Sequence, residues 1–302
     1  MNSSNPKLKR SLGLKALMAT GICSMLGASI NVVPFMIHRS VPGIDSYVLP
    51  AFIFAMLPAF FAALAYGILS SAMPRAGGSY IYASRGLNPY FGFIASFSQW
   101  FGLSIVIGVI AYICVSFIRD VVIGLGFTEA ALLFELPTVK IGISLALIWL
   151  FVFVNIRGAS MYKKTLLPMM YLMFVLGFAV IISGFYFDTS DFVAALQAKE
   201  SKVINIDQIS RFDWRVFLSA SALLFSSFIG FDSIAQAGSE AKNPTKTLPK
   251  AIVLAIFSVG CFYFLFTTAV YHTVPWSFVA EESKLRDISA PGLLNYVLPS
   301  WL

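Results

Sequence analysis

Long apolar runs, separated by short polar segments, recur along nearly the whole chain. A helix that crosses a bilayer needs about 20 mostly apolar residues, and runs of that length favour spanning helices over strands. We therefore predict seven spans, near residues 14 to 36, 47 to 73, 90 to 118, 139 to 156, 166 to 187, 214 to 238 and 250 to 272. An eighth run begins at about Pro291, and we expect it to be cut off at Leu302.

The composition indicates an integral membrane protein. Of the 302 residues, 58% are hydrophobic and only 12% are charged, whereas charged residues make up about 25% of an ordinary soluble domain. The three cysteines, Cys23, Cys114 and Cys261, lie in apolar runs without paired spacing, which argues against disulfides and metal sites. We expect neither a cofactor nor a metal.

The distribution of basic residues predicts the orientation. The net charge is +7, but the basic residues are not gathered into one patch, so we expect no nucleic-acid partner. Alternate loops carry them against a single acid, Glu240, and Lys and Arg in short loops mark the cytoplasmic side. We predict a multi-pass protein of the cell membrane with a cytoplasmic N-terminus. The basic residues are Lys7, Lys9, Arg10, Lys15, Arg75, Arg85, Arg157, Lys163, Lys164, Lys242, Lys246 and Lys250.

The first and sixth predicted spans contain small and polar residues where a spanning helix is normally apolar. They read GLKALMATGICSMLGASINVVPF and LSASALLFSSFIGFDSIAQAGSE, with Asp232 inside the second. Two interrupted helices in corresponding positions of two halves indicate a transporter binding site. The alternative is close helix packing through the small residues, with Asp232 as a hydrogen-bonded packing group.

Three stretches resemble the amino acid/polyamine/organocation (APC) superfamily of amino acid permeases. They are GICSMLGASINVVP, SAMPRAGGSYIYASRGLNPYFGF and FIGFDSIAQAGSEAKNPTKTLPKAI. The resemblance implies an all-α fold with the inverted five-plus-five repeat of leucine-transporter-like proteins, truncated here at the start of helix 8. We expect a cytoplasmic tail over 1–13, a first repeat of helices 1 to 5 over 14–187, an external loop over 188–213 with a short helix at DFVAALQAKE, and a partial second repeat over 214–302.

The resemblance also implies the substrate site. The backbone of helix 1 would receive the substrate carboxylate, carbonyl groups of both breaks would receive its ammonium group, and residues of helix 6 would shape the pocket. Phe231 matches a position that gates the pocket from outside, and helix 3 contributes Ser96, Gln99 and Trp100. The implied site residues are Met25, Gly27, Ala28, Ser29, Ile30, Ser226, Ser227, Phe228, Ile229, Gly230 and Phe231, with Asp232 and Met173 as coupling or packing positions.

Three departures from the family pattern affect these expectations. Ser29 replaces the third glycine of the helix 1 pattern and Asn31 replaces the following phenylalanine, which implies a more polar or tighter pocket. Helix 5 has no lysine, and Met173 stands near the position of the coupling lysine of some proton-coupled members. The missing lysine therefore favours exchange or facilitated diffusion as the mode of transport. The short chain fits a fragment, a disrupted gene product or a chain completed by a partner.

We expect a transporter and not an enzyme, because the sequence has neither an H-E-x-x-H nor a G-x-S-x-G pattern. The main hypothesis is a secondary-active permease for amino acids or related amines that works by alternating access in the lipid bilayer. A neutral amino acid is preferred, because Asp232 is the only acid within a predicted span. The sequence does not identify the coupling ion or counter-substrate. The alternative is a non-transporting or truncated member of the same fold that acts as a remnant, scaffold or sensor subunit.

Overall fold

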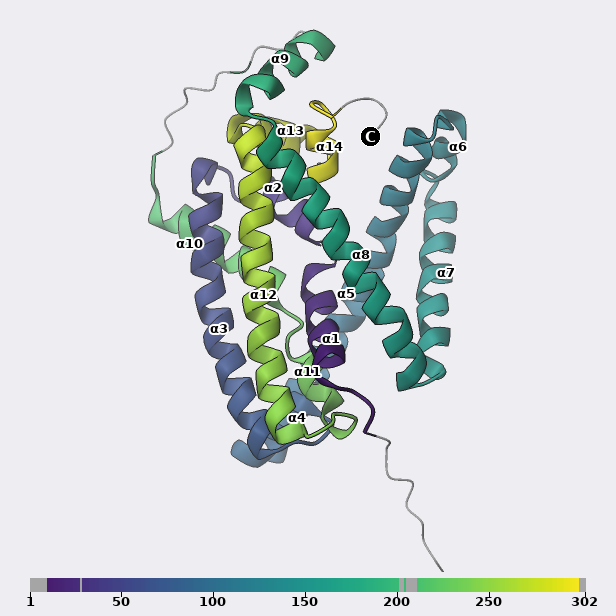
Figure 1. Cartoon of the computed structure of the whole chain (residues 1–302), viewed down its shortest axis with the longest axis vertical. Helices are drawn as coiled ribbons and strands as arrows, with labels where there is room; N and C mark the ends of the chain where they lie inside the picture. Colours follow the sequence, from purple (N-terminus) through teal and green to yellow (C-terminus); the bar gives the residue numbers. More distant parts are fainter. Residues whose placement is uncertain (1–9, 28, 201–203, 205–210, 299–302) are drawn as a thin grey trace, which may run out of the picture.

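A computed structural model describes residues 10–27, 29–200, 204 and 211–298. The described chain is built almost wholly of helices (Figure 1). The main helices are α1 (Leu14–Leu26), α2 (Ser29–Ser40), α3 (Val48–Ala72), α4 (Gly78–Gly86), α5 (Pro89–Gly124), α6 (Thr128–Leu133), α7 (Pro137–Ile156), α8 (Ala159–Tyr186), α9 (Thr189–Glu200), α10 (Trp214–Phe225), α11 (Ser233–Gln236), α12 (Pro244–Thr273), α13 (Trp276–Leu285) and α14 (Ala290–Leu294).

All seven predicted spans are confirmed as helical stretches long and apolar enough to cross a membrane. The last one begins at Pro244 and not near 250, because proline fits the first turn of a helix, where its missing N–H is not needed. The predicted eighth helix is represented, within the described residues, only by the five-residue α14. The spans are Leu14–Ser40, Asp45–Ala72, Pro89–Ile123, Pro137–Ile156, Lys164–Tyr186, Trp214–Ser239 and Pro244–Thr273.

Helix α12 lies at the centre of the bundle. It packs against α3, α1 and α8, and its fully buried side chains include Leu248, Tyr263 and Phe266. Helices α5, α6 and α7 form an arm that leans away from this bundle, and α8 crosses between the two parts (Figure 1). Because α12 touches most of the bundle, a polar group on it can reach several spans.

The arm exposes apolar side chains. Only 11% of the most apolar window of Pro89–Ile123 and 6% of that of Pro137–Ile156 are buried inside the structure. In water such surfaces would be strongly unfavourable, whereas hydrocarbon solvates them and the helices satisfy their own backbone groups. The arm therefore supports the interpretation as a multi-pass membrane protein.

Short helices lie at the two ends of the bundle. Helices α9, α13 and α14 lie at one end and α4 at the other (Figure 1), and α9 confirms the short helix predicted at DFVAALQAKE. At the α4 end, Leu12 forms a parallel β-bridge with Ala241. The Leu12 N–H donates to the Glu240 carbonyl at 3.0 Å, and the Lys242 N–H donates to the Leu12 carbonyl at 2.8 Å. The segment before α1 is thus tied to the segment before α12.

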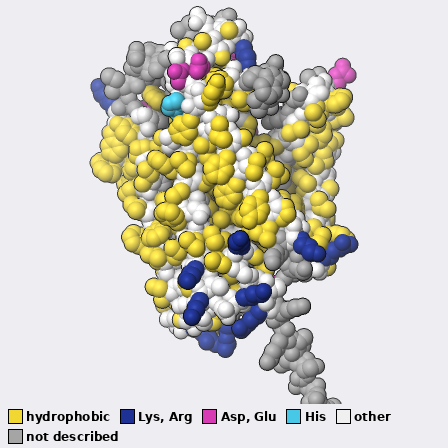
Figure 2. All heavy atoms as spheres, in the orientation of Figure 1, with side chains coloured by type: hydrophobic (Ala, Val, Ile, Leu, Met, Phe, Trp, Pro, Cys, Tyr) yellow, Lys and Arg dark blue, Asp and Glu magenta, His cyan; other side chains and the backbone are white. Residues whose placement is uncertain are grey.

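Charged side chains lie mainly at the two ends of the molecule. Figure 2 shows a broad hydrophobic band around the middle, with most of the visible Lys and Arg near the α4 end and Asp, Glu and His toward the opposite end. An apolar band between polar ends is the pattern expected of a protein that crosses a bilayer.

Candidate functional site

The first span is broken at Gly27. Helix α1 ends at Leu26, α2 begins at Ser29, and Gly27 has a φ of 33° and a ψ of −149°. A positive φ is unfavourable for residues with a Cβ atom, so glycine allows one helix to end and the next to begin. Ser29 Oγ lies 2.9 Å from the Leu26 carbonyl oxygen and 3.2 Å from that of Met25. It thereby provides a donor for carbonyl groups that have no helical amide partner.

The sixth span is broken over Ser226–Gly230. Helix α10 ends at Phe225 and is followed by a single 3₁₀ turn, Ser226–Phe228. Ile229 is extended, with φ −69° and ψ 132°, and Gly230 has a φ of 127°. The Ser233 hydroxyl donates to the Gly230 carbonyl oxygen at 2.6 Å and fixes the start of α11.

The two breaks lie against each other. A Cβ atom on Gly230 would lie 2.8 Å from Ser24 Cβ and 3.0 Å from the Ser24 carbonyl oxygen. The hydroxyl oxygens of Ser24 and Ser233 are 3.3 Å apart. Irregular backbone at membrane depth is tolerated only where it is buried in protein or lines a cavity. The contact therefore places two sets of free backbone groups in one region.

Tyr263 of α12 supports the first break and contacts the second. Its fully buried hydroxyl lies 2.8 Å from Ser29 Oγ and donates to the Met25 carbonyl oxygen at 3.2 Å. Its ring centroid is 5.9 Å from that of Phe228. Sequence reasoning missed this residue because an aromatic side chain in an apolar run resembles core packing. The available signal was the hydroxyl, since a buried tyrosine normally finds a hydrogen-bond partner.

A hydrogen bond joins α5 to the second break. The side-chain amide of Gln99 donates through Nε2 to Oδ2 of Asp232. Both side chains are half-buried, and polar groups inside a membrane are normally paired in this way. The sequence predicted both residues, and the structure brings them together.

Phe231 packs against α3, near the start of α4. Its ring contacts that of Tyr66 edge to face, with centroids 5.4 Å apart. The Tyr66 hydroxyl lies 2.8 Å from Ser79 Oγ at the start of α4, and the Tyr66 ring also contacts that of Tyr82. Burial, with a smaller contribution from Tyr66, raises the pKa of Tyr82 to about 12, so its phenol is neutral at physiological pH. Phe231 thus joins a group of aromatic rings from α3 and α4, and its role as a gate stays a prediction.

Comparison with known proteins identifies the family. The family model described as "Amino acid permease" matches residues 12–293, which include both helix breaks and all seven spans. The chain belongs to the amino acid permease family. The resemblance found in the sequence is thereby confirmed.

Relatives of this chain include two curated cadaverine/lysine antiporters, one from Escherichia coli strain K12 and one from Escherichia coli O157:H7. Each is 24% identical to the chain over 300 residues, which cover 96% of this chain and 60% of the relative. The chain therefore spans 60% of the length of these relatives. The family and the relatives are transporters and not enzymes.

The predicted backbone residues of this chain meet at the two breaks but differ in exposure. Gly27, Ser226 and Ile229 are exposed and Ser29 is half-buried, so they mark the open face of the breaks. Ala28 lies outside the described residues. The buried members are Met25, Ile30, Ser227, Phe228, Gly230 and Phe231.

The remaining predicted residues differ in burial and in their contacts. Met173 of α8 packs against the hydrophobic core, as a packing residue would. Ser96 is half-buried, whereas the Trp100 side chain is 63% exposed and contacts Phe97. Of the three residues predicted on helix 3, Gln99 is therefore the one that a described hydrogen bond links to the breaks.

Proposed function

We propose that the protein moves a small amino acid or related amine across the cell membrane by alternating access, with the two helix breaks as its substrate site. The observation that carries this proposal is the contact of Gly230 with Ser24, which sets the broken sixth span against the end of α1. Free N–H groups at the start of α2 suit a carboxylate, and carbonyl groups at broken helix ends suit an ammonium group. An amino acid carries both groups.

The carbonyl groups of the breaks differ in whether they already accept a hydrogen bond within the protein. The Met25 carbonyl oxygen lies within hydrogen-bonding distance of the Ser29 and Tyr263 hydroxyls, and the Ser226 carbonyl accepts the Ile229 N–H at 3.2 Å. We therefore assign the substrate ammonium group to the carbonyl groups of Ser227 and Phe228. The substrate side chain would then lie beside Ile229.

The contacts between α1 and α11 support a mechanism in which these two half-helices move together as one unit. Ser24 and Ser233 join the two helices near the breaks, and the Leu12–Ala241 bridge joins their neighbouring segments at the α4 end. Two half-helices that are tied at both ends would tilt together, as alternating access by rocking requires. The basic α4 end would face the cytoplasm, with the N-terminus inside.

The substrate class that we propose is a neutral amino acid. The carboxylate of Asp232 already accepts a hydrogen bond from Gln99, so it is engaged by an amide and not held free for a second ammonium group. The relatives named cadaverine/lysine antiporters make dicationic amines and lysine the main competing class. Exchange is the coupling mode that we propose, since residues 166 to 187 contain no lysine and these relatives are named antiporters.

The first test is ligand-dependent stability of the purified chain. A ligand that binds only the native state raises the apparent stability of the protein. We expect a stereospecific rise in the thermal midpoint with neutral L-amino acids, and a smaller rise with lysine and cadaverine. The reverse order would contradict the substrate class while supporting the site.

The second test is flux in proteoliposomes. Replacing Ser29 with leucine fills the first break and should abolish saturable uptake, whereas Ser219→Leu, the same exchange on an exposed position of α10, should leave uptake intact. Normal uptake by the Ser29 variant would show that the site is wrong. Specific binding without flux in the unaltered chain would favour the non-transporting alternative.

A further inference from the structure

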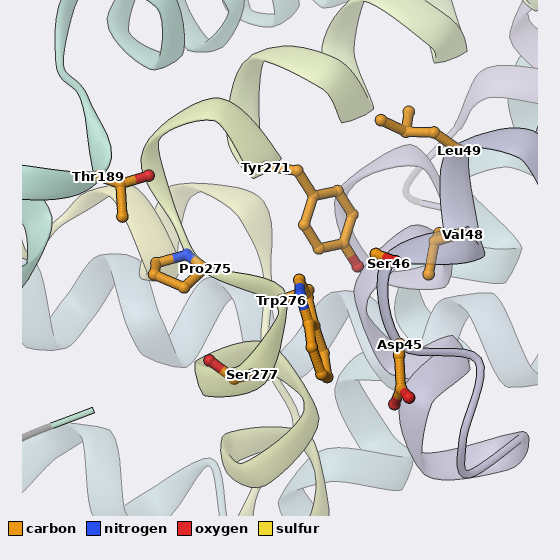
Figure 3. Close-up of a pocket in the computed structure, with 9 residues that line it drawn as sticks. All are labelled: Asp45, Ser46, Val48, Leu49, Thr189, Tyr271, Pro275, Trp276 and Ser277. Carbon is orange, nitrogen blue, oxygen red and sulfur yellow. The ribbon is translucent and has the colours of Figure 1, made fainter. Parts of the chain in front are cut away.

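A cavity of about 290 Å³ lies at the α9 and α13 end of the bundle, away from the helix breaks. It is lined by one carboxyl group, several hydroxyl groups and two aromatic rings (Figure 3). None of these lining residues belongs to either break. The residues are Asp45, Ser46, Val48, Leu49, Thr189, Tyr271, Pro275, Trp276 and Ser277.

One wall of the cavity carries its negative charge. Asp45 precedes α3 and has a φ of 47°, a conformation that Asp and Asn tolerate better than most residues do. Among the nine described lining residues there is no Lys or Arg. A carboxylate that has no cation in the same lining favours a cationic ligand over a zwitterion, whose own carboxylate it would repel.

The aromatic residues provide a face for such a cation. Figure 3 shows Tyr271 and Trp276 between the wall that carries Asp45 and the wall that carries Pro275. The Tyr271 ring is held in place, because its hydroxyl donates to the Pro34 carbonyl oxygen at 2.9 Å and lies 3.0 Å from His38 Nε2. A cation within about 6 Å of a Trp or Tyr face is attracted by the π system.

We propose that this cavity binds the ammonium group of a small alkylamine, with Asp45 as its charged partner and Trp276 as its aromatic partner. A primary ammonium has three donors, and the hydroxyl oxygen of Thr189, which itself donates to the His272 carbonyl, offers a further acceptor. The alkyl part lies against Val48, Leu49 and Pro275. The volume is slightly below the range of about 300–1,000 Å³ that is usual for ligand pockets, so the ligand is small.

One neighbouring charge opposes the ligand. The exposed Lys284 of α13 interacts electrostatically with Asp45 and therefore competes with a bound ammonium for the same carboxylate. Substitutions of Asp45 and Lys284 should consequently change affinity in opposite directions. A structural role of the cavity alone would not produce this pair of effects.

The test uses the full chain in lipid nanodiscs, with n-butylammonium chloride as the probe and calorimetric titration at constant ionic strength. Asp45→Asn, which keeps the backbone conformation accessible, should weaken binding by about tenfold or more, since the negative charge that attracts the ammonium is lost and the remaining hydrogen bond is weaker. Trp276→Leu should weaken it about two- to fivefold. Lys284→Gln should strengthen it. Glu281→Gln removes one exposed negative charge from α13 outside the lining and should change nothing.

Two further measurements separate this site from the substrate site. Neutral n-butanol should give no saturable heat, and Ser29→Leu, which fills the first helix break, should bind butylammonium as the unaltered chain does. Equal binding by the Asp45→Asn variant, or equal binding of butanol, would overturn the proposal. Binding that is lost with Ser29→Leu but kept with Asp45→Asn would also overturn it, and would support the substrate site at the helix breaks.

Discussion

The hydroxyl group of Tyr263 lies 2.8 Å from that of Ser29, and this contact links the middle of α12 to the restart of the first span. Tyr263 also donates to the Met25 carbonyl oxygen on the other side of the break. The break therefore has a donor from another helix in addition to its own serine. In the rocking mechanism proposed above, this contact has to be kept or exchanged when α1 and α2 move.

Replacing Tyr263 with phenylalanine should destabilise the protein and slow uptake. The substitution keeps the ring that stacks on Phe52 and removes only the hydroxyl, so we expect a loss of about 0.5–1.5 kcal/mol. The measurements are the unfolding midpoint in detergent and the rate of uptake in proteoliposomes.

The matched control for that variant is Thr267→Val, one turn farther along α12. The Thr267 hydroxyl is fully buried and has no hydrogen-bond partner among the described residues. Its removal should be neutral or stabilising, because an unsatisfied polar group is eliminated. If both variants lose stability equally, the hydroxyl contact of Tyr263 does not support the break.

Gly230→Ala should be one of the most damaging small substitutions in the chain. Its φ of 127° is unfavourable for any residue with a Cβ, and the added atom would press on Ser24. We expect a loss of about 1–3 kcal/mol from backbone strain alone, together with loss of uptake. Gly108→Ala, in the open interior of α5 with nothing within 4 Å of its Cβ position, should instead stabilise the helix by about 0.5–1 kcal/mol. A harmless Gly230 variant would show that the close approach of the breaks is not required.

The spans could be predicted from sequence because their hydrophobic signal is long and strong, as at Pro137–Ile156. The breaks could be located because glycine and serine are unusual at that depth. Tyr263 and the outer cavity could not be predicted, because each depends on side chains from spans far apart in the chain. Tyr271 and Asp45, for example, are separated by more than 200 residues and meet only after α3 and α12 pack. The helix predicted from Pro291 onward is longer than α14, which ends at Leu294. An apolar run alone does not determine where a helix ends.

Gln99 and Asp232 should be energetically coupled. Their hydrogen bond spans α5 and the second break, so Gln99→Leu and Asp232→Ala remove the same interaction, and the double variant should lose less than the sum of the single losses. We expect a coupling energy of about 0.5–3 kcal/mol, measured by unfolding midpoints of all four proteins. Gln197→Leu on the exposed face of α9 provides a control that should add independently to Asp232→Ala. Strict additivity of the Gln99 and Asp232 changes would contradict a functional bond between arm and break.

Asp188 should make the stability of α9 depend on pH under acidic conditions. Its Oδ1 accepts hydrogen bonds from the Ser190 hydroxyl at 2.5 Å, the Ser190 N–H at 2.9 Å and the Asp191 N–H at 3.0 Å. These bonds, the Ser190 hydroxyl first, lower the pKa of the Asp188 carboxyl below its usual 3.8. Since the pKa is lower in the folded state, the stabilisation is fully present above 3.8 and is lost as the pH falls through the folded value.

The fraying of α9 can be followed through the amide hydrogen exchange of its first turn. At neutral pH the carboxylate caps the helix, so Asp188→Ala should speed exchange there, whereas Asp188→Ser, which keeps an acceptor oxygen, should restore most of the protection. Lowering the pH below 3.8 should speed exchange in the unaltered chain, after correction for intrinsic rates, and leave the alanine variant unaffected. Because α9 places Phe192 against Phe278 of α13, loss of the cap should also loosen that contact. An alanine variant with unchanged exchange would show that packing by Phe192, and not the cap, holds α9 in place.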